Sequence, residues 1–67
     1  MQTYEIKGMT CNHCVMAVTK ALAKVPGVSR VEGVDLASGR AMIEGSPDEE
    51  AVIAAITDEG YQATRAS

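Results

Sequence analysis

Apolar and polar residues follow two different periods along this 67-residue chain. Short segments in which they alternate, or in which valine is frequent, are typical of β-strands. Longer segments in which apolar residues recur every three or four positions indicate amphipathic helices. The patterns predict strands at residues 3–7, 28–36, 40–44 and 61–65, and helices at residues 13–25 and 47–59.

Both predicted helices carry boundary signals. Pro26, which a glycine follows, is expected to end the first helix. Ser46, Pro47 and Glu49 form a capping-box pattern, in which Ser46 caps the second helix and Pro47 occupies its first position. Gly60 is expected to end that helix. The residues of this helix that we expect to be buried are Val52, Ile53 and Ile56.

The order strand, helix, strand, strand, helix, strand predicts an α+β fold of the ferredoxin-like βαββαβ type. In that fold, two helices cover one face of a four-stranded antiparallel sheet. The first strand lies beside the last, so the start of the last strand, at Tyr61, is expected close to the loop that contains Cys11. Gly33 breaks the alternation between Val31 and Val34 and predicts a β-bulge.

Composition and charge exclude several classes of protein. A chain of this length has room for one small domain, which we expect to comprise residues 1–67. Its net charge of −3 argues against nucleic acid as the main partner. The longest apolar run, residues 51–56, is too short to cross a bilayer, so no membrane insertion is expected. The first residues lack the pattern of a secretory signal, which predicts a soluble cytoplasmic protein.

The two cysteines of the chain are only three positions apart, at Cys11 and Cys14. A structural disulfide is a weak explanation, because so short a loop would contribute little stability. Packing in the core is a second explanation. It suits Cys14, which lies on the apolar stripe of the first predicted helix, better than Cys11, which lies in the loop before that helix. Backbone N–H groups and the helix dipole at this position favour thiolate over thiol. The pair therefore points to thiolate chemistry, either soft-metal binding or thiol–disulfide exchange.

The segment Gly8-Met9-Thr10-Cys11-Asn12-His13-Cys14 matches the GMTCxxC signature of heavy-metal-associated domains. The chain most resembles the small bacterial copper chaperones of that family, and the resemblance extends to Gly60-Tyr61. It implies a Cu(I) carrier and not an enzyme, in which the sulfurs of Cys11 and Cys14 bind one Cu(I). The ion would pass by ligand exchange to a copper-transporting P-type ATPase with matching CxxC domains. A metal-bridged homodimer with four pooled cysteines is a further hypothesis.

The resemblance also implies roles for residues beside the cysteines. The family's counterpart of Met9 points inward and anchors the loop, while a third ligand is the alternative for this soft thioether. Thr10 stands where related divalent-metal domains often carry Asp, so its lack of charge favours a monovalent ion. Tyr61 is either a partly buried aromatic or a hydrogen-bonding neighbour of the metal loop. His13 is expected to face solvent, with thiolate tuning or ligation in a dimer as alternatives.

Two apolar residues after the motif, Val15 and Met16, fall mostly off the apolar stripe of the first predicted helix. Together with Lys20 they are interpreted as a docking surface for the partner.

Other functions share parts of this pattern. Carriers of zinc, cadmium or mercury share the motif, and an amino-terminal domain excised from the ATPase would share the fold. A thiol–disulfide oxidoreductase would share the sequence Cys-x-His-Cys, but this chain is too short for a thioredoxin domain.

Overall fold

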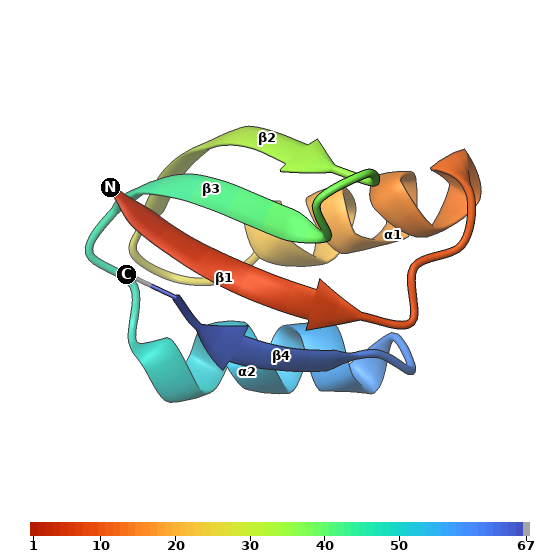
Figure 1. Cartoon of the computed structure of the whole chain (residues 1–67). Coiled ribbons are helices and arrows are strands. Elements are labelled where there is room, and N and C mark those ends of the chain that lie inside the picture. Colours follow the sequence, from red (N-terminus) through yellow and green to blue (C-terminus); the bar gives the residue numbers. More distant parts are fainter. Residues whose placement is uncertain (67) are drawn as a thin grey trace.

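Two helices pack on one face of a four-stranded antiparallel sheet in the computed structural model, which describes residues 1–66 (Figure 1). The strand order is β2-β3-β1-β4, and every pair of neighbours is antiparallel. This arrangement confirms the predicted ferredoxin-like fold. The elements are β1 (Gln2–Lys7), α1 (Asn12–Ala23), β2 (Val28–Asp35), β3 (Arg40–Gly45), α2 (Glu49–Asp58) and β4 (Gln62–Arg65).

The core lies between the sheet and the helices and draws on both predicted periodicities. Alternate residues of β1 and β3 point toward the helices, while one stripe of each helix points toward the sheet. Six large side chains are fully buried there: Tyr4, Leu22, Ile43, Ile56, Val18 and Val52. Of the three α2 residues expected to be buried, only Ile53 is half-exposed, and it packs against the edge of the core.

A β-bulge in β2 lies where the sequence predicts it. Val31 pairs with Ile43 of β3 and Gly33 with Met42, which leaves one extra residue on β2. In a regular strand, Val31 and Val34 would point to opposite faces, because their separation is odd. The extra residue brings both side chains against the core.

The predicted start of α2 is wrong. The helix begins at Glu49, after Asp48 as the N-cap residue, and no side chain caps it. Pro47 is buried outside the helix and packs so closely on Gly27 that a Cβ there would lie 2.9 Å from the Cα of Pro47. Long-range packing therefore fixes Pro47 before the first helical turn and removes Ser46 from the capping position.

The cysteine-containing loop lies at the end of the molecule opposite the amino terminus (Figure 1). β1 leads into this loop, and β4 begins at the same end because it pairs antiparallel with β1. Gly8 has a φ of 106°, and a Cβ at this position would lie 3.2 Å from Cδ1 of Tyr61. The expected proximity of Tyr61 and the loop is therefore confirmed. No helix within residues 1–66 is long and apolar enough to cross a membrane.

Candidate metal-binding site

Cys11 and Cys14 lie on either side of the first turn of α1. Cys11 is the N-cap residue and has extended backbone angles, and its carbonyl accepts a hydrogen bond of 3.0 Å from the N–H of Cys14. Both thiols are free; Cys11 is exposed and Cys14 is half-buried. Their Sγ atoms lie 4.0 Å apart. The start of the helix thus brings two sulfurs together without a disulfide.

The loop stabilises the thiolate form of Cys14. A backbone hydrogen bond from Thr10 is the largest cause, followed by a hydrogen bond from the Tyr61 hydroxyl and a backbone hydrogen bond from Cys11. Together they outweigh the opposing effect of burial and lower the pKa of Cys14 to about 6. At neutral pH this sulfur is therefore an anion, which is the form that binds metals.

Tyr61 donates its hydroxyl hydrogen bond to Cys14, and this bond raises the pKa of Tyr61. Both features expected of this tyrosine occur together, since its hydroxyl is directed at the sulfur site while its half-buried ring packs against the core. Topology alone indicates that Tyr61 lies near the loop. The direction of its hydroxyl depends on how the chain turns at Gly60, which has a φ of 94°.

Met9 and Thr10 play different parts in the loop. Met9 is half-buried and packs against the core, as expected of an anchor. Thr10 is exposed, and its Oγ1 lies 4.0 Å from Sγ of Cys14. The sequence indicates only that Thr10 lacks a charge, whereas its backbone also donates a hydrogen bond to Cys14. No residue pattern signals that bond, since it exists only when the loop folds back over the helix terminus.

His13 lies between the two cysteines on α1, and its side chain is exposed. Within residues 1–66, no cluster of three or more His, Cys, Asp or Glu side chains could hold a metal ion. The site therefore offers two sulfur ligands and an open side. Such a site suits a soft ion with few ligands better than a closed tetrahedral zinc site, which needs four.

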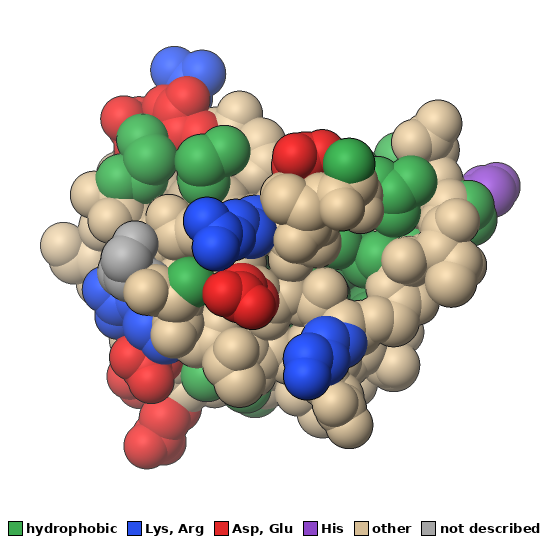
Figure 2. All heavy atoms as spheres, in the orientation of Figure 1, with side chains coloured by type: hydrophobic (Ala, Val, Ile, Leu, Met, Phe, Trp, Pro, Cys, Tyr) green, Lys and Arg blue, Asp and Glu red, His purple; other side chains and the backbone are tan. Residues whose placement is uncertain are grey.

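The residues predicted to dock a partner follow the sulfur pair along α1. Met16 is 55% exposed, Val15 is half-buried and Lys20 is exposed. Met16 and Lys20 are four residues apart and share a helix face. Apolar side chains reach the surface at the end of the molecule where α1 begins (Figure 2).

The model of the family described as "Heavy-metal-associated domain" matches residues 3–62. Copper-transporting ATPase 1 from Rhizobium meliloti (strain 1021) is 44% identical over 61 residues, which are 88% of this chain and 7% of that protein. Mercuric reductase from Shigella flexneri is 44% identical over 68 residues, which are 98% of this chain and 12% of the reductase. The chain thus spans only a small part of these two relatives.

A relative of similar size is copper chaperone CopZ from Enterococcus hirae. It is 35% identical over 65 residues, which cover 92% of this chain and 93% of the chaperone. The solved apo form of the Enterococcus hirae copper chaperone superposes with a TM-score of 0.87 at 32% identity, over 97% of this chain and 98% of that one. Sequence and structure thus agree over nearly the whole chain, and this protein belongs to the heavy-metal-associated domain family.

Proposed function

We propose that this protein is a copper carrier that binds one Cu(I) between the Sγ atoms of Cys11 and Cys14. The observation that carries the proposal is the pair of free sulfurs 4.0 Å apart, one exposed and one half-buried. The lowered pKa of Cys14 supports it, because a thiolate is the form that binds metals. Thiolate sulfur is the ligand type that Cu(I) prefers in proteins. The similarity to a copper chaperone and to a copper-transporting ATPase supports copper as the cargo.

The cargo leaves by ligand exchange. A thiolate of the acceptor forms a bond to Cu(I), and the bond to exposed Cys11 then breaks. A second acceptor thiolate replaces Cys14 in the same way. Copper stays Cu(I) throughout, and each released sulfur keeps its electron pair. The open side of the two-sulfur site gives the incoming thiolate access to the ion.

The acceptor that we propose is a copper-transporting P-type ATPase with a matching CxxC domain. The relatives support it, since a similar sequence occurs in a copper chaperone and in a copper-transporting ATPase. This similarity fits equally a chain that is itself a domain of the ATPase. Val15, Met16 and Lys20 form the docking surface in this proposal. We propose the cytoplasm as the place of transfer, because a reducing compartment keeps both thiols free.

The other residues of the loop support the ligands and do not bind the ion themselves. Met9 anchors the loop in the core. The backbone N–H of Thr10 and the hydroxyl of Tyr61 hold the charge of Cys14. Exposed His13 remains solvated in the monomer. These residues set how readily a sulfur releases the ion.

Carriage of Hg(II) is the second candidate function. The 44% identity to mercuric reductase over almost all of this chain favours it, and Hg(II) is a soft ion like Cu(I). Thiol–disulfide exchange is a different kind of function that the same sulfurs would allow. Turnover of a dithiol substrate in the absence of metal would reveal that activity.

The test is an anaerobic titration with Cu(I) against a competing chromophoric chelator, repeated with Zn(II) and Hg(II). We expect one Cu(I) per chain, much weaker Zn(II) binding, and loss of most of the Cu(I) affinity in Cys11→Ser and Cys14→Ser. Ala23→Ser is the matched control, because it adds a hydroxyl at an exposed position of α1.

Preferential binding of Zn(II), or unchanged Cu(I) affinity in either cysteine variant, would refute the copper proposal. Native mass spectrometry of the same samples tests the metal-bridged homodimer, which predicts loaded pairs only while the cysteines are intact.

A further inference from the structure

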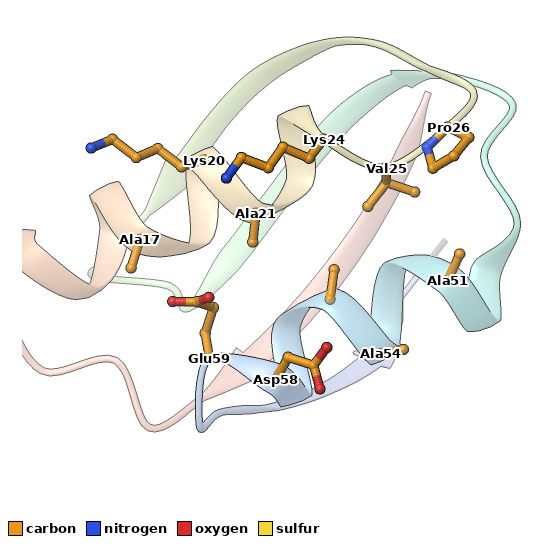
Figure 3. A pocket seen from close by; sticks show the side chains of 11 residues that line it. Ala17, Lys20, Ala21, Lys24, Val25, Pro26, Ala51, Ala54, Asp58 and Glu59 are labelled. Carbon is orange, nitrogen blue, oxygen red and sulfur yellow. The ribbon is translucent and has the colours of Figure 1, made fainter.

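A groove of about 520 Å³ runs between α1 and α2 on the helical side of the molecule (Figure 3). Alanine is the most frequent residue in its walls. Ala17 and Ala21 point from α1 toward α2, while Ala51, Ala54 and Ala55 line the opposite wall. Such short side chains keep both walls of the groove low, so that a facing pair of helices can approach this face closely.

Opposite charges flank the groove on its two sides. Lys20 and Lys24 lie on the α1 side, and Asp58 and Glu59 lie at the end of α2 (Figure 3). All four side chains are exposed. Each salt bridge that residues 1–66 form involves an arginine, so these lysines and carboxylates are not paired across the groove.

The sheet face differs from the helical face in how its charges are arranged. Basic and acidic side chains are interspersed there (Figure 2), and ion pairs such as Arg40–Glu5 at 3.6 Å join neighbouring strands. On the helical face the two signs are separated by the groove. A separated pattern leaves charge available for a partner, whereas an interspersed pattern is largely satisfied within the chain.

We propose that the helical face binds a second copy of this chain, with a two-fold axis along the groove. Rotation about that axis places α1 of one copy over α2 of the other. Lys20 and Lys24 of each copy then face Asp58 and Glu59 of its partner. A two-fold interface requires a self-complementary surface, and a groove with cations on one side and anions on the other meets that requirement.

The size of the face sets the strength of this dimer. The molecule measures 27 × 19 × 18 Å, so its largest face has the dimensions 27 × 19 Å. Two such faces would bury about 1,000 Å² in total, which lies at the low end for specific interfaces. The dimer is therefore weak and reversible. It dissociates further at high salt, because opposite charges on the two sides of the groove hold the copies together.

This dimer differs from the metal-bridged one, since it needs neither copper nor cysteine. We therefore test it with metal-free protein that carries Cys11→Ser and Cys14→Ser. Sedimentation velocity from micromolar to millimolar concentration measures the dissociation constant. Retention of the far-UV circular dichroism spectrum and of the melting transition checks that each variant is folded.

Two charge-reversed forms are added to that background. One carries Lys20→Glu and Lys24→Glu, and the other carries Asp58→Lys and Glu59→Lys. Each alone opposes like charges, so we expect its dissociation constant to rise by about tenfold or more. An equimolar mixture restores opposite charges on both rims, and we expect the mixed pair to associate at least as tightly as the parent. A control with Lys7→Glu and Arg30→Glu has the same net charge as the first form and should still dimerise.

Four results would overturn the proposal. The first three are a parent that stays monomeric at every concentration, reversed forms that associate as well as the parent, and a mixture that fails to associate. If the Lys7→Glu and Arg30→Glu control dissociates as much as the first reversed form, net charge and not the groove governs association, and the proposal is again wrong.

Discussion

The thiolate of Cys14 leads to a quantitative prediction about its reactivity. We take the Cys11→Ser variant, which leaves one thiol, and measure its alkylation by iodoacetamide between pH 4 and pH 10. The hydrogen bonds from Thr10, Tyr61 and the backbone at position 11 lower the pKa of Cys14 from 9.0 to about 6. The rate should therefore rise with a midpoint near pH 6.

The absolute rate is a poorer indicator than the midpoint. At pH 7, a thiol with a pKa of 6 is about 90% ionised, and one with a pKa of 9 is about 1% ionised. Intrinsic nucleophilicity falls as the pKa falls, which cancels most of this gain and leaves an advantage of only about three- to sixfold. The midpoint of the pH–rate curve is free of this cancellation, because it depends only on the pKa of the thiol.

The contribution of Tyr61 is separated by Tyr61→Phe, which keeps the ring and removes the hydroxyl. We expect the midpoint for Cys14 to move to higher pH, since the second-largest stabilising hydrogen bond is gone. Tyr4→Phe is the matched control, because the Tyr4 hydroxyl bonds to Gln2 and not to the sulfur site. An alkylation midpoint near pH 9 in the Cys11→Ser protein, or an equal shift of that midpoint in both tyrosine variants, would refute this account of the site.

Three further predictions concern metal binding and stability. Cu(I) affinity should fall as the pH drops below about 6, because protons then compete for the Cys14 sulfur; a chelator titration at pH 5 and pH 7 measures this, and equal affinities would contradict it. Gly33→Ala should stabilise the fold by about 0.4–1 kcal/mol in urea unfolding, since a Cβ there meets nothing within 4 Å. Ile56→Val should destabilise the protein by about 0.5–1.5 kcal/mol, because Ile56 is fully buried, and an unchanged urea midpoint would argue against its place in the core.

Much of the fold can be predicted from the sequence because local patterns and topology agree. Alternation in β1 and the helical stripe of α1 both select residues that are buried together, such as Tyr4 and Leu22. The bulge at Gly33 is also visible in the sequence, since Val31 and Val34 reach the same face only if one extra residue intervenes.

The errors and omissions arise where distant segments meet. Ser46 and Pro47 form a sound capping pattern, but packing of Pro47 against Gly27 prevents its use. The hydrogen bond from the backbone of Thr10 to Cys14 depends on how the loop closes. The groove between α1 and α2 depends on the distance between the helices, which an alanine-rich sequence does not fix.

The central claim is that both sulfurs bind the same copper ion. X-ray absorption at the copper edge tests it most directly, on protein loaded with less than one Cu(I) per chain and kept dilute enough to remain monomeric. We predict two sulfur neighbours for each Cu(I). A spectrum in which the nitrogen of His13 or an oxygen atom replaces one of the two sulfurs would contradict the account.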